Sequence, residues 1–285
     1  MIQHQRLSGG RLHLQQGPID LVIGVDAPER VKAQAEDAAL SRFSEVLEEL
    51  VRELPLLRQP WSAEQRPPQG PIACRMYRAV AGFREFVTPM AAVAGSVAEE
   101  ILEALLSGVG DPLSSGLRRA YVNNGGDLAL WLSPGESFVI GVANHPERPE
   151  LSARINLRCE NTVRGVATSG WRGRSQSLGI ADAVTVLARS ASQADAAATL
   201  IANAVNVEHP GIERRPASEA QDDSDLGDRL VTTAVPALPP EVVQQALDHG
   251  VQRAEQWVDA GRVESVYLSL QHQIRLVGSQ QEHIS

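Results

Sequence analysis

The chain has 285 residues, of which 43% are hydrophobic and 21% charged. This is enough for one large core or two modest ones, and it excludes a chain that is disordered throughout. The net charge is −9, and the basic residues, all arginine except Lys32, are scattered along the chain, which argues against nucleic acid as the main partner.

The cysteines and the N-terminus indicate a compartment. Cys74 and Cys159 lie far apart without a Cys-x-x-Cys pair, which excludes a cysteine metal cage and favours a reducing environment. The N-terminal twenty residues lack the pattern of a secretory signal, and no window holds about 18 uninterrupted apolar residues. We therefore expect a cytoplasmic protein that neither is exported nor spans a membrane.

The first part of the chain predicts strands and then helices. Residues 11–25 alternate around Gly17-Pro18 and predict a hairpin. Helical spacing with Pro28 in the first turn predicts a helix over 27–54. Five prolines in 55–71 indicate a loop, and helical patterning returns at 72–83.

A run of small residues opens the next predicted helix. Thr88 is expected as its cap and Pro89 as its first helical position, and the residues up to Ser96 are almost all small and apolar. Such a helix start exposes free N–H groups toward an anion, although tight helix packing explains the same composition.

Residues 119–132 predict a strand interrupted by Asn123-Asn124-Gly125-Gly126-Asp127. An Asn-Gly pair normally indicates a two-residue hairpin turn, but we expect the turn at 133–136, before a further strand over 138–143. Gly125-Gly126 would then be a bulge or a place where backbone meets a ligand. Asn123 and Asp127 offer hydrogen-bonding groups for a ribose or a ring edge.

Residues 162–188 combine a strand, a polar connection and a buried strand over 183–188. The connection offers hydroxyls, bare backbone and two guanidiniums, which are the donors that phosphate oxygens require. An exposed polar loop is the competing interpretation. The candidate binding residues in it are Thr168, Ser169, Gly170, Arg172 and Arg174.

The helix expected over 193–205 carries Asp195 and Thr199 in a run of alanines. Four-residue spacing places both oxygens on one helix face, close enough to share a divalent cation, whereas a buried helix with one N-terminal acid has the same pattern. Residues 208–240 predict a mobile loop. A last helix is expected over 241–260 and a C-terminal strand around 265–276.

Taken in order, these motifs resemble the ApbE family of FAD:protein FMN transferases, and look closest to the branch that lacks a His-Ile-x-Asp-Pro motif. The resemblance covers roughly 88–206, and the order of the motifs is more specific than any one of them. The motifs are the small-residue start at 89–96, Val122 to Leu128, Ala167 to Gly170, Val184 to Leu187 and Ala194 to Thr199.

The resemblance implies two cofactors, FAD and Mg²⁺. Asp195 and Thr199 match the metal ligands, completed by a backbone carbonyl from the small-residue run, for which we take Ala91. The Asn123 to Asp127 segment matches the part lying against the flavin nucleotide, and Thr168-Ser169-Gly170 matches a motif of the same cleft. In the family, a hydroxyl of an acceptor protein attacks the FMN phosphorus and AMP leaves.

Two departures from the family concern the chemistry. The family has a lysine where this chain has Ala94, and its His-Ile-x-Asp-Pro-x-Thr-Gly segment is compressed here to 177–182, without histidine or proline. Asp182 could replace the missing base or could brace the following strand. His145, in a loop, does not fill that role.

For architecture we expect an α+β protein, ApbE-like and T-fold-like, with a mixed or antiparallel sheet flanked by helices in a single unit over 1–285. Three functions stay open: Mg²⁺-dependent FMN transfer, a non-transferase module that binds a flavin or another heterocycle, and an enzyme for an unrelated small ring or amide that uses Asp182, Arg172 and Arg174. The composition permits a homodimer.

Overall fold

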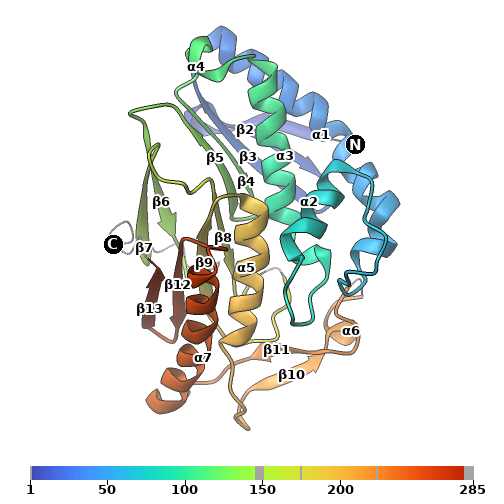
Figure 1. Ribbon diagram of the computed structural model, residues 1–285, viewed down its shortest axis with the longest axis vertical. Helices are drawn as coiled ribbons and strands as arrows, with labels where there is room; N and C mark the ends of the chain where they lie inside the picture. The colour runs from blue at the N-terminus through green and yellow to red at the C-terminus, as the bar shows by residue number, and fades with distance from the viewer. Residues whose placement is uncertain (1, 145–150, 174, 223, 279–285) are drawn as a thin grey trace. The chain divides into compact units, whose positions relative to one another are not determined.

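A computed structural model describes residues 2–144, 151–173, 175–222 and 224–278. Figure 1 shows the course of the chain and its helices and strands. The chain divides into two compact units. The first comprises residues 1–138, 157–166 and 189–193, and the second comprises 139–156, 167–188 and 194–285. Each unit takes separate stretches of the chain, so neither is a continuous sequence domain. The expectation of a single unit over 1–285 stays a prediction.

The sheet of the first unit has the strand order β1-β2-β3-β4-β5-β8, and its pairs from β1 to β8 are antiparallel. Leu14 pairs with Leu21 and both are fully buried, because alternate residues of a strand face the same side. The predicted hairpin over 11–25 is therefore confirmed. The strands are β1 (Gln3–Arg6), β2 (Leu12–Gln16), β3 (Ile19–Asp26), β4 (Arg119–Asn124), β5 (Asp127–Leu132) and the start of β8 (Gly165–Ser169).

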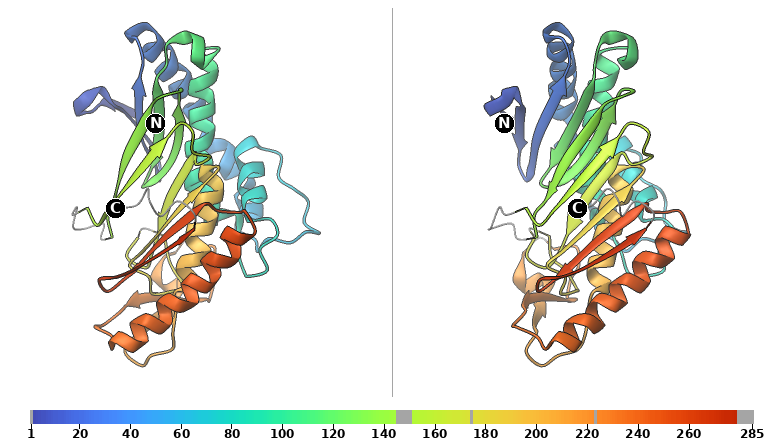
Figure 2. Two further views of the ribbon diagram at one scale, coloured as in Figure 1. Left: turned by 60° about the vertical axis from the view of Figure 1, so that its left-hand side comes forward. Right: turned by 90° about the vertical axis from the view of Figure 1, so that its left-hand side faces the viewer.

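Helices cover this sheet. Long helices α1 and α3 lie side by side, and α3 packs on β4 and β5 (Figures 1 and 2). Phe43 of α1 and Ile101 of α3 are fully buried, and burial of each such side chain contributes roughly 1.5–3 kcal/mol. The helical elements are η1 (Ser8–Gly10), α1 (Glu29–Leu57), α2 (Pro71–Val80), η2 (Pro89–Ala92), α3 (Val93–Gly108) and α4 (Pro112–Ser115).

A network of ion pairs joins these helices. Arg42 of α1 donates from Nε to Glu100 of α3 at 2.8 Å, and Arg75 of α2 pairs with Glu99 of α3 at 2.5 Å. Burial alone would lower the pKa of Arg75, but its glutamate partners raise it above the ordinary value. The arginines therefore stay charged and hold the three helices together.

The turn predicted at 133–136 is present, because Glu136 N donates to Ser133 O at 3.2 Å between β5 and β6 (Ser137–Val142), but the bulge predicted at Gly125-Gly126 was wrong. Asn124 pairs with Asp127, so Gly125 and Gly126 form a two-residue hairpin turn between β4 and β5. Their φ angles are 64° and 120°, which a residue with a Cβ rarely adopts. The ordinary rule for an Asn-Gly pair holds here, and the glycines are not a bulge.

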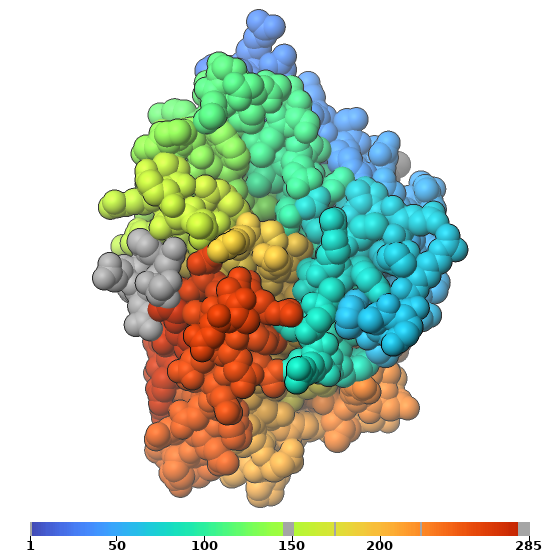
Figure 3. Space-filling model, in the orientation of Figure 1, coloured from blue at the N-terminus to red at the C-terminus, as the bar shows by residue number. Residues whose placement is uncertain are grey.

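Most of the remaining strand residues belong to the second unit. Its sheet order is β8-β9-β12-β13, and α7 packs on β12 and β13 (Figure 2). The outer face of α7 lies at the surface (Figure 3). A Cβ at Gly250 of α7 would lie 2.8 Å from Leu268, so glycine permits this close approach. The elements are β9 (Ala183–Ala188), α7 (Pro240–Asp259), β12 (Ser265–Leu270) and β13 (Gln273–Gly278).

Helix α5 (Ala191–Ala204) begins in the first unit and continues in the second. Two further pairs of strands form small sheets. They are β6 (Ser137–Val142) with β7 (Ala153–Arg158), and β10 (Glu213–Pro216) with β11 (Leu230–Ala234), the latter joined through α6 (Ala217–Ala220). The mobility expected of 208–240 stays a prediction, and this segment carries β10, α6 and β11.

Two boundary predictions were wrong. The single C-terminal strand is two antiparallel strands, β12 and β13, because the chain turns at Gln271-His272. These residues adopt φ angles of 45° and 67° without the glycine that usually permits them. Helix α1 runs past Pro55 to Leu57, whose side chain is fully buried. The α+β class with an antiparallel sheet flanked by helices is confirmed.

Candidate functional site

The glycine hairpin of the first unit is tied to the small-residue run. Asn124 Nδ2 donates to the carbonyl oxygen of Ala94 at 3.1 Å, and Asn123 Oδ1 accepts from Gly126 N at 2.8 Å. Asn124 and Asp127 are buried, whereas the two glycines are exposed. Because a buried amide needs a partner, the contact with Ala94 fixes the hairpin tip against the start of α3. Two predicted motifs are thus brought together within one unit.

The predicted metal ligands of the second unit lie on one face of α5. Asp195 and Thr199 are half-buried and one helical turn apart, and the residues between them, Ala196 to Ala198, are buried. Ala91, the third predicted ligand, lies in η2 of the first unit and is half-buried.

This donor set fits magnesium only in part. Within the described residues, no group of three or more His, Cys, Asp or Glu side chains is arranged to hold a metal ion. Mg²⁺ commonly takes one or two protein carboxylates and completes its shell with water and phosphate oxygens. One carboxylate and one hydroxyl on α5 therefore suit a cation that arrives with a phosphorylated ligand, and do not suit a metal cage made of protein alone.

The connection after β8 is a tight turn packed on Asp182. Gly173 N donates to Gly170 O at 3.1 Å, and Trp171 N donates to Ala181 O at 3.0 Å. A Cβ at Gly170 would overlap the carbonyl oxygen of Asp182, so only glycine allows this approach. The turn that carries Arg172 is therefore fixed by its backbone.

Asp182 is buried and its two carboxylate oxygens are both engaged. Oδ1 accepts from Arg172 Nε at 3.2 Å, and Oδ2 accepts from Gln271 N at 2.6 Å. Its backbone N donates to Ser269 O at 3.0 Å. These contacts hold the turn between β12 and β13 in its uncommon conformation, and the choice between base and brace for Asp182 stays a prediction.

The compressed segment 177–182 is anchored to α5. Asn203 Oδ1 accepts from Ser177 Oγ at 3.1 Å and from Leu178 N at 2.9 Å. A Cβ at Gly179 would overlap the carbonyl oxygen of Ala202. The compressed segment therefore packs on the helix that carries Asp195.

The hydroxyls of the Thr-Ser-Gly motif lie at the end of β8. Thr168 is exposed, and its Oγ1 lies 2.8 Å from Thr185 Oγ1 of β9. Ser169 is half-buried. Arg174, the remaining predicted phosphate donor, lies outside the described residues.

Sequence reasoning missed Asn203 and Gln271. Asn203 could have been noticed, because it is a polar residue within the apolar run of a helix. Gln271 gives no such signal, since its role depends on its backbone N–H and on the turn that places it beside Asp182.

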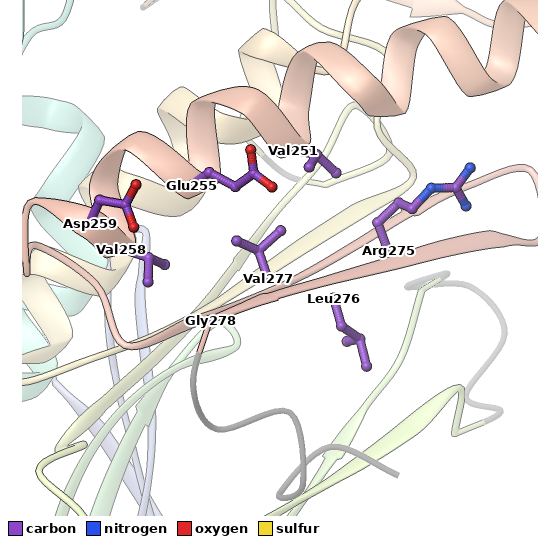
Figure 4. Close-up of a pocket in the computed structure, with 8 residues that line it drawn as sticks. All are labelled: Val251, Glu255, Val258, Asp259, Arg275, Leu276, Val277 and Gly278. Atoms are coloured by element: carbon purple, nitrogen blue, oxygen red, sulfur yellow. The ribbon is translucent and has the colours of Figure 1, made fainter.

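A cavity of about 330 Å³ lies between α7 and β13 (Figure 4). Glu255 and Asp259 project from α7, and Arg275 comes from β13. None of the predicted site residues that the structure describes lines this cavity. The lining residues are Val251, Glu255, Val258, Asp259, Arg275, Leu276, Val277 and Gly278.

The described helices include none with both the length and the apolar composition needed to span a bilayer.

The chain matches a family model over almost its whole length. Residues 3–276 match the model described as "AbpE bacteria". A UPF0280 protein of Methanopyrus kandleri is 34% identical over 234 residues, which cover 79% of this chain and 89% of the relative. A UPF0280 protein of Methanococcus maripaludis is 32% identical over 185 residues, which cover 65% of this chain and 71% of the relative.

These matches define a protein of the ApbE-like class. The chain belongs to the family described as "AbpE bacteria", and the resemblance inferred from its motifs is confirmed.

Solved structures with similar chains include ApbE proteins. The ApbE protein of Thermotoga maritima is 15% identical, with 99% of this chain and 98% of that chain covered and a TM-score of 0.42. The flavinyl transferase ApbE of Pseudomonas stutzeri is 12% identical, with 98% and 94% covered and a TM-score of 0.39.

Proposed function

We propose that this protein binds a flavin dinucleotide together with Mg²⁺. The observation that carries the proposal is the family match over residues 3–276, a range that includes every predicted site residue. Two local arrangements support it: the glycine hairpin tied to the start of α3, and the carboxylate and hydroxyl on one face of α5.

The exposed Gly125-Gly126 turn would lie against the flavin nucleotide. Without side chains, the two glycines let a planar ring or a ribose approach the backbone closely. Asn123 already fixes the turn by accepting from Gly126 N, so the surface is formed before the ligand arrives. The bond from Asn124 to Ala94 keeps the small-residue run beside it.

Asp195 and Thr199 would hold the Mg²⁺, with the carbonyl of Ala91 as the third protein ligand. When bound, the cation would neutralise the negative charge of the diphosphate. The alanines between and before these two residues are buried, so on this part of α5 Asp195 and Thr199 are the residues that reach toward the solvent. Thr168 and Ser169 would add hydroxyl donors from the end of β8.

The reaction that suits such a ligand is transfer of FMN to a hydroxyl of an acceptor protein. The acceptor oxygen would form a bond to the FMN phosphorus, the bond between that phosphorus and the AMP phosphate oxygen would break, and the acceptor proton would pass to a base. Asp182 is the candidate for that base.

A second candidate function is binding of the flavin, or of another small heterocycle, without transfer. The contacts of Asp182 favour it, because both of its oxygens accept hydrogen bonds, from Arg172 and from Gln271. The lysine and histidine of the family are also absent. Catalysis on an unrelated ring by the same residues, action in the cytoplasm and a homodimer remain predictions from the sequence.

The test is isothermal titration of the metal-stripped protein with FAD, with and without Mg²⁺. Asp195→Ala and Thr199→Val should each weaken the Mg²⁺-dependent binding by about tenfold or more, because each removes one cation ligand. Asp248→Ala is the matched control, since Asp248 is an exposed aspartate on α7. Absence of FAD binding in every condition would refute the proposal.

A second measurement separates the two functions. AMP release from FAD, in the presence of Mg²⁺ and an acceptor peptide of the family type, would support transfer. Tight binding of FAD without AMP release would support the binding module.

A further inference from the structure

Arg172 is held rigidly although it lies at the surface. It occupies a central position of the four-residue turn closed by the bond from Gly173 N to Gly170 O. The turn is attached to the chain before β9 by the bond from Trp171 N to Ala181 O. The backbone of Arg172 is therefore fixed on both sides.

Its side chain is fixed as well. The guanidinium carbon lies 4.2 Å from the centroid of the Trp171 ring, a close cation–π contact, and Nε donates to Asp182 Oδ1 at 3.2 Å. A flat group supported on one face and held at one edge has lost most of its rotational freedom before any ligand binds.

Asp182 leaves the outer edge of this guanidinium open. Its second oxygen accepts from Gln271 N at 2.6 Å, so it does not engage Arg172 in a bidentate manner. Among the described residues, Nη1 and Nη2 of Arg172 have no protein partner, and 41% of the side chain is exposed. A guanidinium has five N–H donors, of which the protein uses one.

We propose that Arg172 is a preorganised anion-binding residue whose two terminal nitrogens take a pair of phosphate oxygens from the ligand. The parallel N–H groups of a guanidinium match two oxygens of a phosphate, a pairing that ammonium groups cannot reproduce. Trp171 and Asp182 are positioning residues. The choice of a diphosphate of a flavin dinucleotide as the ligand rests on the proposed function, whereas the anion site itself does not.

The probe is inorganic pyrophosphate, titrated into the full-length protein without Mg²⁺ and followed by calorimetry and by tryptophan fluorescence. Arg172→Ala should weaken binding by about tenfold or more, since hydrogen bonds to charged groups are the strong ones. Arg172→Lys keeps the positive charge but lacks the pair of parallel N–H groups. It should therefore recover only a small part of the pyrophosphate affinity that Arg172→Ala loses. Arg253→Ala is the matched control, because Arg253 also lies over an indole, 5.9 Å from the Trp257 ring centroid.

A fluorescence change that disappears in Trp171→Phe, while calorimetric binding persists, would place the anion beside this indole. Equal pyrophosphate binding by wild type and Arg172→Ala would overturn the inference, as would full recovery by Arg172→Lys or no binding by wild type. A parallel titration with FAD separates the two proposals. Pyrophosphate binding that needs Arg172, without FAD binding, supports the anion site and refutes the flavin assignment. FAD binding that is equally tight in wild type and in Arg172→Ala would support the flavin assignment and refute Arg172 as the residue that takes the phosphate oxygens of FAD.

Discussion

Gly179 is the position where one added methyl group should reveal how the compressed segment is held. A Cβ there would overlap the carbonyl oxygen of Ala202 and lie 2.9 Å from both Ala202 C and Asn203 Cα. Carbon atoms prefer a separation of about 3.5–4.0 Å, so the two carbon contacts alone require a shift of roughly 0.6–1.1 Å away from α5, and the overlap with the carbonyl oxygen requires more. All three atoms belong to the helix backbone, which cannot rotate aside as a side chain would.

Gly179→Ala should therefore lower the free energy of unfolding by about 3 kcal/mol, at the upper end of the range for overpacked cores. At about 2–4 °C per kcal/mol, the melting temperature should fall by roughly 6–12 °C in differential scanning calorimetry. Gly173→Ala is the control, because the nearest atom to its Cβ is Gly170 O at 3.2 Å, and it should shift the midpoint by less than about 3 °C. If the two variants melt together, the close packing of Gly179 on α5 is refuted.

Three further changes test single contacts. Glu99→Gln replaces the carboxylate that accepts from Ser192 N at 3.1 Å with a neutral amide. The free energy of unfolding in urea should fall by about 1–2 kcal/mol, and an unchanged urea midpoint would contradict this. Asn124→Ala removes the hydrogen bond to Ala94 O and should lower the free energy of unfolding by about 1 kcal/mol. Amide hydrogen exchange at the hairpin should also become faster, and unchanged exchange would show that this hydrogen bond does not hold the hairpin in place. Burial alone would raise the pKa of Asp26, but its two arginine partners lower it below the ordinary 3.8. That stabilisation is present above pH 3.8 and lost as the pH falls through the lowered pKa, so Asp26→Asn should flatten the acid dependence of the melting temperature in this range.

Elements with strong periodicity could be predicted from the sequence. The helix over 27–54 and the buried strand over 183–188 lie where apolar spacing places them, because in both cases tertiary packing selects the same face as the local pattern. The turn between β12 and β13 could not be predicted. Gln271-His272 has neither glycine nor asparagine, and its backbone conformation is held by Asp182, which lies far away in the sequence.

In the candidate site, too, some features could be predicted from the sequence and others could not. The spacing of Asp195 and Thr199 on a helix follows from sequence alone, as does the exposed backbone of a Gly-Gly pair. The turn of Gly125-Gly126 was misplaced because a second turn signal, at Pro134-Gly135, follows one strand later. When two turn signals follow each other closely, the strand pairing must be known before either can be assigned as a hairpin turn. Strand pairing depends on residues far apart in the sequence.

The contacts of Asp182 bear on the two roles that the sequence leaves open for it. A general base needs a lone pair directed at the proton it removes, and an environment that releases it after transfer. Here one oxygen stabilises a strained turn through Gln271 and the other orients Arg172, so protonation of Asp182 would weaken both contacts at once. These two contacts favour a positioning role for Asp182. Asp182→Asn separates the two roles: loss of AMP release from bound FAD supports Asp182 as the base of the proposed transfer, whereas weaker pyrophosphate binding with AMP release retained supports the positioning role.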